Sequence, residues 1–306
     1  MTLPSTPVTI REVGTRDGIQ SLGAFIDTAQ KVELLEALAD AGLRRIEATS
    51  FVSPRAVPQM SDAADVMSRA RRVPGVSYEA LVPNARGAQD ALAAGMDAIL
   101  LVVIASETFN RKNVRMSVDD SMTQFASIKA MVDAAGVSCI GAIGTAFGCP
   151  YEGEVPESRL YALIERFLDM GFSELMIADT TGMANPVQIE GTMGRVLDRW
   201  GDSLSFGLHL HNTRGMGLAN VVAGLHAGVT LFDASVAGIG GCPFAPQAAG
   251  NISTEDTVHM LHEMGLSTGV DLERLIEVAR FAQQILGREL PGQVMKAGPR
   301  SQRHAA

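Results

Sequence analysis

The sequence predicts a (β/α)8 barrel, the TIM-barrel fold of the α/β class, with one extra C-terminal helix. One unit returns along the chain: a helical stretch, a stop at Ala-Gly or Met-Gly, and then a short β-rich run. Glycine suits the left-handed position at which a helix ends, so each stop marks a passage from helix to strand. Eight β-rich runs alternate with eight helical patterns, without a Gly-x-Gly-x-x-Gly turn. This number of units favours a barrel over the alternative, a doubly wound sheet.

The predicted elements run through the whole chain without a linker. Strands are predicted over residues 8–14, 44–50, 76–82, 98–106, 137–146, 174–180, 204–212 and 231–238. Helices are predicted near residues 28–41, 60–72, 84–94, 117–135, 156–170, 185–199, 216–227 and 253–264. A further helix near 271–287 falls outside the eightfold pattern, and the polar tail 292–306 is expected to be frayed. We therefore expect a single catalytic domain over residues 1–306.

Composition excludes several classes of partner. The chain has 306 residues and a net charge of −9, which argues against nucleic acid or an anionic membrane as a partner. No apolar run is long enough to span a bilayer, and residues 1–10 lack the features of a signal peptide. Three cysteines are too few for a disulfide framework, so a reducing cytoplasm is expected. Of these, Cys139 is predicted to be an inert core thiol and Cys149 a structural turn residue.

A histidine pair closes the seventh predicted strand. Phe206, Leu208 and Leu210 alternate with smaller or polar residues, as in a strand. Side chains two residues apart share a face, so the imidazoles of His209 and His211 lie about 7 Å apart along the strand and are directed at one target. Two hydrogen-bonded core histidines are the alternative. The pair favours a metal site, because the strand then breaks into a loop of the kind that builds active sites.

Polar groups recur where the other predicted strands end, which is the end of a barrel that carries the chemistry. They are Glu12, Arg16, Asp17, Glu47, Ser50, Ser106, Glu107, Thr145, Asp179 and Thr180, and the eighth strand opens into a glycine-rich loop that holds Cys242. Burying uncompensated charge is costly, so this gathering predicts a metal ion or an anionic substrate. An internal ring of salt bridges is the alternative, but it leaves the histidine pair unexplained. The carboxylate of Asp17, the two imidazoles and an amide oxygen form a donor set that suits Mg²⁺ or Mn²⁺.

Four longer motifs carry a resemblance to a known family. They are Glu12-Val-Gly-Thr-Arg-Asp-Gly-Ile-Gln20, Ile46-Glu-Ala-Thr-Ser-Phe-Val-Ser-Pro54, Gly148-Cys-Pro-Tyr-Glu-Gly153 and Gly238-Ile-Gly-Gly-Cys-Pro243. With His209-x-His211, they make the chain similar to the 3-hydroxy-3-methylglutaryl-CoA lyase family of metal-dependent TIM-barrel lyases from about residue 8 to 287.

The resemblance implies a reaction and a set of site residues. It implies cleavage of 3-hydroxy-3-methylglutaryl-CoA to acetyl-CoA and acetoacetate, as in leucine degradation. By analogy with the family we expect a homodimer without nucleic-acid or membrane partners. It makes Mg²⁺ or Mn²⁺ the cofactor, held by Asp17, His209, His211 and Asn251. The catalytic residues would be Arg16, which stabilises the enolate, Cys242 on its mobile loop, and Glu47 and Asp179 near the substrate. Gln20 is expected to contribute to cofactor binding.

Departures from the family pattern leave the substrate open. Asn212 stands where the lyase commonly has Asp, Arg214 where it has Tyr, and Ala178 where it has Gly. Arg214 adds a cation near the site mouth, where it would pair with a second substrate carboxylate or face solvent. Citramalyl-CoA and longer 3-hydroxyglutaryl-CoA thioesters are therefore alternative substrates. A condensing synthase of the same barrel class is a further alternative, although such enzymes usually add a regulatory domain, and only about 40 residues follow Gly265.

Overall fold

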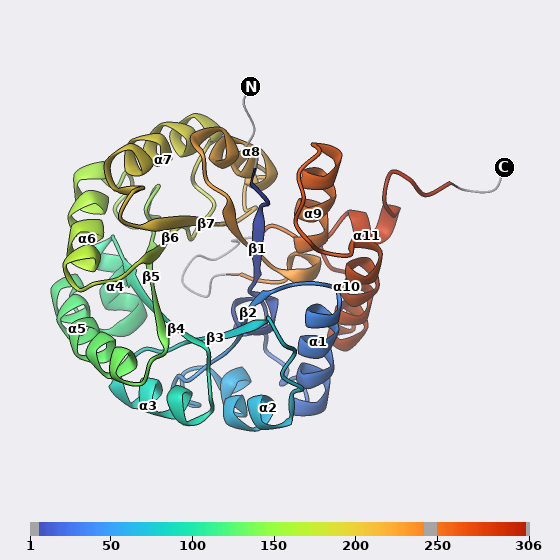
Figure 1. Ribbon diagram of the computed structural model, residues 1–306, viewed down its shortest axis with the longest axis horizontal. Coiled ribbons are helices and arrows are strands. Elements are labelled where there is room, and N and C mark those ends of the chain that lie inside the picture. Colours follow the sequence, from blue (N-terminus) through green and yellow to red (C-terminus); the bar gives the residue numbers. More distant parts are fainter. Residues whose placement is uncertain (1–5, 242–249, 304–306) are drawn as a thin grey trace.

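Eight parallel strands close into a barrel in the computed structural model, which describes residues 6–241 and 250–303 (Figure 1). Each strand pairs with its neighbours in sequence, and β1 closes the ring against β8. The strands are β1 (Thr9–Glu12), β2 (Arg45–Ser50), β3 (Ser77–Leu81), β4 (Ala98–Ile104), β5 (Ser138–Gly144), β6 (Glu174–Asp179), β7 (Ser205–Leu210) and β8 (Leu231–Ala234). The predicted (β/α)8 fold is confirmed.

Helices surround the ring of strands. They are α1 (Thr28–Asp40), α2 (Ala63–Arg69), α3 (Ala85–Ala93), α4 (Glu107–Val114), α5 (Val118–Ala134), α6 (Glu157–Asp169), α7 (Pro186–Trp200), α8 (Gly217–Ala227), α9 (Thr254–Glu263), α10 (Leu272–Leu286) and α11 (Val294–Ala297). Short turns η1 (Gly14–Gly18), η2 (Pro58–Met60) and η3 (Val236–Gly238) interrupt the loops. In Figure 1, α9, α10 and α11 lie together on one side of the ring. Within the described ranges, no helix is both long and apolar enough to cross a membrane.

Two helices were not predicted, and local bonds explain both. The sequence of α4 is polar and lacks an apolar period, but Ser106 caps its first turn by accepting a hydrogen bond from the Phe109 N–H. Near the C-terminus, the carboxylate of Asp256 accepts hydrogen bonds from the N–H groups of Gln293 and Val294, where α11 begins. The segment predicted to be frayed therefore starts with residues that are bonded to α9.

The inside of the barrel has an apolar half and a polar half. Alternate residues of β4 and β5 pack inside the ring, together with Met176 and Leu231, while the residues between them pack against the helices. The polar half comes from β1, β2, β3 and β8, together with Glu174 of β6. There the buried Arg11 bonds both Asp233 and Glu79, and Arg45 bonds both Glu79 and Glu174.

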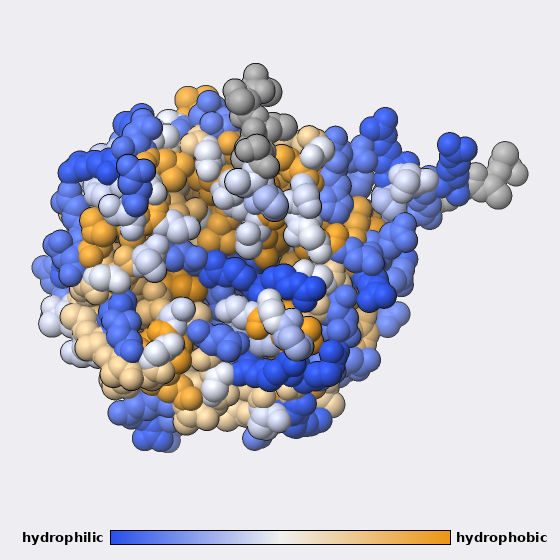
Figure 2. Space-filling view, viewed as in Figure 1, coloured by the Kyte–Doolittle hydropathy of each residue, from blue (hydrophilic) through white to orange (hydrophobic). Residues whose placement is uncertain are grey.

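These ion pairs add to the sequence pattern, which placed polar groups only where the strands end. Arg11, Arg45, Glu79, Glu174 and Asp233 all lie within strands and point into the barrel. The view of Figure 2 shows hydrophilic residues gathered across the middle of the barrel and apolar residues around them. The structure therefore contains internal salt bridges, the arrangement that was considered as an alternative to a metal site.

We predict that Glu79→Gln destabilises the fold by ~3–5 kcal/mol, since it leaves the buried guanidinium of Arg11 and the partly buried one of Arg45 without their shared carboxylate. Urea unfolding would measure the change in the free energy of unfolding. Asp90→Asn is the matched control, because it breaks an exposed pair with Arg86, for which we expect about 0.5 kcal/mol or less. Equal effects of the two substitutions would contradict a special contribution of the internal pairs.

Candidate metal centre and active site

The turn η1 brings two charged side chains to the top of the barrel immediately after β1. It is a single turn of π-helix with the sequence Gly-Thr-Arg-Asp-Gly, and all five residues are buried. Its two glycines allow close packing: a Cβ on Gly14 would lie 2.6 Å from Glu12 Oε1, and one on Gly18 would lie 2.9 Å from Ser235 Oγ. Such turns occur often at functional sites. The two glycines thus allow the turn that carries Arg16 and Asp17 to pack closely against the ends of β1 and β8.

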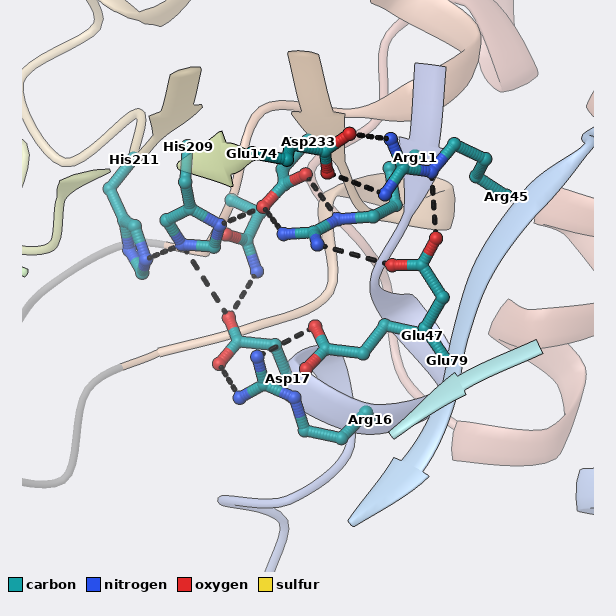
Figure 3. Close-up of polar contacts among 11 residues, drawn as sticks. Arg11, Arg16, Asp17, Arg45, Glu47, Glu79, Glu174, His209, His211 and Asp233 are labelled. Atoms are coloured by element: carbon teal, nitrogen blue, oxygen red, sulfur yellow. Dashed lines mark hydrogen bonds and ion pairs between the residues drawn. The ribbon is translucent and has the colours of Figure 1, made fainter. Parts of the chain in front are cut away.

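Asp17, His209 and His211 form a cluster that can hold a metal ion. One ligand atom from each lies within 4.8 Å of the others. The Nε2 atoms of the two histidines are 3.1 Å apart, and His209 Nε2 lies 3.9 Å from Asp17 Oδ2 (Figure 3). The structure therefore brings together the histidine pair and the carboxylate that the sequence predicted.

Asn251 completes the predicted donor set. Its Nδ2 donates a hydrogen bond to Asp17 Oδ2 at 2.8 Å, and its backbone pairs with His211 in an isolated bridge. Its Oδ1 is buried and has no hydrogen-bond partner among the described residues. An orphaned amide oxygen beside a carboxylate and two imidazoles is a donor set that fits Mg²⁺ or Mn²⁺.

The charges around the cluster also fit a divalent cation. A connected network of ion pairs runs through the barrel to Asp17, and the described part of it holds the arginines Arg11, Arg16 and Arg45 and the carboxylates Asp17, Glu47, Glu79, Glu174 and Asp233. With neutral histidines, three positive charges face five negative ones. A bound divalent cation would balance the remaining two charges, which is favourable in a buried site.

Arg16 is held between two carboxylates. Its Nη1 donates to Asp17 Oδ1 at 2.8 Å and its Nη2 to Glu47 Oε2 at 2.7 Å. Burial alone would raise the pKa of Asp17, but the charge of Arg16, together with the neighbouring His209, outweighs it and lowers the pKa. Burial raises the pKa of Glu47 in spite of Arg16. Within the described chain, Arg16 Nε and Glu47 Oε1 are buried without a partner, so these two atoms are available to a ligand.

Asp179 and Gln20 have contacts within the protein. Both oxygens of Asp179 accept backbone N–H groups, from Met183 and Ala184, so this carboxylate shapes the loop after β6. Burial raises the pKa of Asp179 to about 6, although these hydrogen bonds oppose the shift. Gln20, predicted to bind the cofactor, donates to Asp17 Oδ1 at 2.7 Å. It therefore reaches the candidate centre through Asp17.

Two buried glutamates brace the start of the glycine-rich loop. Glu12 Oε1 accepts hydrogen bonds from the N–H groups of Gly14 and Val236, and its Oε2 accepts one from the Thr254 hydroxyl. Glu255 Oε2 accepts the N–H of Ala237, whose φ of 56° is left-handed. Together they connect the turn that carries Arg16 to η3. Cys242, the predicted loop acid, lies outside the described residues.

The departures at positions 212 and 214 have structural uses. Asn212 Oδ1 accepts the N–H of Gly217, the first residue of α8. Arg214 Nη1 donates to the carbonyl oxygens of Thr181 and Gly182, and so joins the loop after β7 to the loop after β6.

The other two cysteines, Cys139 and Cys149, lie where they were expected. Cys139 is a buried thiol of β5 whose pKa burial raises to about 12, and Cys149 Sγ bonds Ser106 Oγ in a turn.

Sequence reasoning missed Asp233 and Arg11. Asp233 Oδ2 lies 3.0 Å from His209 Nδ1, and Arg11 bonds both oxygens of Asp233 at 2.7 Å. A signal was present, because Asp233 stands inside the apolar run Leu231-Phe-Asp-Ala234. A charged residue inside a strand that is buried on both faces needs a partner.

Comparison with known proteins gives one family over almost the whole chain. A family model described as HMGL-like matches residues 7–282. A hydroxymethylglutaryl-CoA lyase of Bacillus subtilis is 42% identical over 93% of this chain and 95% of its own length. An (R)-citramalyl-CoA lyase of Chloroflexus aurantiacus is 43% identical over 95% of each chain. The structure of an HMG-CoA lyase from Acinetobacter baumannii, in complex with coenzyme A and 3-methylmalate, superposes over 100% of both chains with a TM-score of 0.95 at 40% identity.

We predict that Glu255 makes the stability of the protein depend on pH. Burial, with the adjacent charge of Asp256, raises the pKa of Glu255 from 4.5 to about 8. Between these values the folded protein keeps a proton that the unfolded chain releases, so the free energy of unfolding falls as the pH rises from about 5 to about 8.

Glu255→Gln should flatten this slope by as much as ~1.4 kcal/mol per pH unit, measured by urea unfolding at each pH. Glu33→Gln is the control, since that side chain is exposed on α1 and its removal should leave the slope as in the wild type. A Glu255→Gln profile parallel to the wild-type profile would refute the assignment.

Proposed function

The chain belongs to the HMGL-like family, and we propose on this premise that it is a divalent-metal-dependent carbon–carbon lyase acting on a 3-hydroxyacyl-CoA thioester. The resemblance predicted from the four sequence motifs is confirmed by the family match. The observation that carries the proposal is the cluster of Asp17, His209 and His211 with Arg16 beside it. The chain is also similar, to about the same degree and over nearly its full length, to a hydroxymethylglutaryl-CoA lyase and to a citramalyl-CoA lyase.

We propose that Asp17, His209, His211 and Asn251 hold the cation. The fit rests on the mixed nitrogen and oxygen donors, the orphaned Oδ1 of Asn251 and the two uncompensated negative charges of the network. Mg²⁺ and Mn²⁺ are the ions that suit this set. When bound, such a cation lowers the pKa of a substrate hydroxyl and so favours cleavage of the neighbouring carbon–carbon bond.

The residues of the chain supply the remaining chemistry. Cleavage moves the electron pair of the broken bond onto the thioester, so negative charge develops on its carbonyl oxygen. The Arg16 guanidinium, fixed by Asp17 and Glu47, keeps Nε for that oxygen and needs little reorganisation as the charge grows. Glu47 Oε1 lies beside it as an acceptor for the substrate, and Asp179 shapes the adjoining loop. We assign protonation of the enolate carbon to the Cys242 thiol.

We propose 3-hydroxy-3-methylglutaryl-CoA as the substrate, cleaved to acetyl-CoA and acetoacetate. The motifs at the strand ends support it, and Asn212 and Arg214, which pointed to another acyl group, are engaged in capping α8 and joining two loops. Citramalyl-CoA is the second candidate, because a citramalyl-CoA lyase is 43% identical to the chain. We further propose a single catalytic domain and, by analogy alone, a homodimer.

Removal of the cation should abolish activity. After treatment with EDTA and dialysis, we expect no thioester cleavage, and addition of Mg²⁺ or Mn²⁺ should restore it. His211→Ala should lose most Mn²⁺ binding by isothermal titration, whereas His262→Ala should retain it, because His262 is exposed and bonds Thr268. Full activity of a metal-free sample would refute the cation's role.

A panel of CoA thioesters tests the substrate. We expect the highest kcat/KM for 3-hydroxy-3-methylglutaryl-CoA, followed by citramalyl-CoA and longer 3-hydroxyglutaryl-CoA thioesters. If another member is cleaved about tenfold more efficiently, equivalent to ~1.4 kcal/mol in transition-state binding, the substrate assignment fails and the lyase assignment survives. If no thioester is cleaved with any divalent metal, the reaction class fails, and condensation of acetyl-CoA with 2-oxo acids becomes the reaction to test.

A further inference from the structure

Asp233 lies between a candidate metal ligand and a buried arginine, in one row across three strands. His209 of β7 and Arg11 of β1 both stand in register with Asp233 of β8. Asp233 Oδ2 is 3.0 Å from His209 Nδ1, while Arg11 donates from Nε to Oδ1 and from Nη2 to Oδ2, each at 2.7 Å (Figure 3). The guanidinium therefore grips the carboxylate as a fork.

The fork prevents the carboxylate from rotating. Arg11 is 1% exposed, and its Nη1 is bonded to Glu79 at 3.2 Å. Glu79 is bonded in turn to Arg45, which makes two bonds to Glu174. Bidentate pairs of this kind fix geometry as well as charge. The orientation of Asp233 is thus set from the opposite end of the barrel.

A fixed carboxylate determines which nitrogen of His209 faces the metal cluster. An ionised carboxylate only accepts hydrogen bonds, so His209 Nδ1 must carry a proton to bond Asp233. In the neutral ring, the lone pair is then on Nε2, the atom that faces His211 and Asp17. A ligating histidine usually has such a partner on its other nitrogen, which fixes the ring and its tautomer.

The interior of the barrel does not require charged side chains such as Arg11 and Asp233 to be well packed. Ala98, Leu100, Ile140, Ala142 and Met176 fill the other half of the same barrel with apolar side chains. Buried ion pairs are often no more stabilising than such packing, because removing charges from water is costly. Stability alone therefore gives little reason for Arg11 and Asp233 at these positions.

We propose that Asp233 and Arg11 are positioning residues that set the ring orientation and tautomer of His209, and thereby the affinity of the site for a divalent cation. The inference rests on the proposed cation site. It goes beyond it by assigning part of the affinity to two residues that do not ligate the ion.

Mn²⁺ titration, followed by the EPR signal of the free ion, tests the proposal without substrate. We expect Asp233→Asn to weaken Mn²⁺ binding about 10- to 100-fold, the range found for such outer partners. Arg11→Lys keeps the charge and loses the fork, so we expect a smaller loss of about threefold to tenfold. Glu157→Gln is the control: it also replaces a carboxylate held by two bonds from an arginine, Arg195, but it lies outside this network, and binding should stay within about twofold.

¹⁵N NMR of the metal-free protein, labelled at histidine, gives a second readout. We expect His209 of the wild type to be protonated at Nδ1, and Asp233→Asn to produce a mixture of tautomers. Equal weakening of Mn²⁺ binding by Asp233→Asn and Glu157→Gln, or unchanged binding in Asp233→Asn, would overturn the proposal. If Asp233→Asn fails to fold, the test rests on Mn²⁺ binding by Arg11→Lys and on the tautomer of His209 in the wild type. A wild-type His209 that is protonated only at Nε2 would overturn the proposal. Absence of Mn²⁺ binding in the wild type would instead refute the cation site itself.

Discussion

The rest of this structure depends on the burial of charge inside a closed barrel. Side chains that point into a closed ring cannot turn away to water, so the charged side chains of β1, β2, β3, β6 and β8 must satisfy one another. Arg11 forms ion pairs with both Asp233 and Glu79. The same bonds that make the polar half of the lumen tolerable also lead to His209 and Asp17. The site is therefore the end of a network and not an isolated group of ligands.

Sequence periodicity was sufficient to predict the order of strands and helices, because most of the predicted helices end at a small-residue-glycine stop and the predicted strands are short and β-rich. It was also sufficient to bring Asp17, His209 and His211 to one end of the barrel, whereas Asn251 was named from the family resemblance. It failed for α4, whose polar sequence shows no period and which depends on the Ser106 cap. It also failed for Arg11 and Asp233, since their pairing depends on the closure of β1 against β8, a contact between residues 222 positions apart. A local pattern shows that Asp233 interrupts an apolar run, but it does not identify the partner.

The structure separates the part that would hold the cation from the part that braces the loop. Asp17 and the two histidines are supported from within the barrel by Arg16 and Asp233. The start of the glycine-rich loop is held by the carboxylates of Glu12 and Glu255, which accept the N–H groups of Val236 and Ala237. The N–H of Gly292 donates to the Ala237 carbonyl at the same place. Arg16 and Asp17 belong to both parts, because the turn that carries them is bonded to Glu12. Their geometry thus depends on the barrel interior and on the loop at once.

The bonds of Glu12 have a consequence for synthesis of the protein on the ribosome. Its carboxylate joins Gly14, Val236 and Thr254, and Asn251 bonds Asp17 across 234 positions of the chain. Contacts of such long range form late, because a large loop must close before they are made. The candidate site therefore cannot be complete before residue 251 has emerged, and until β8 emerges Arg11 lacks Asp233. An N-terminal fragment that stops before β8 would contain Asp17, His209 and His211 but would lack Asp233 and Asn251.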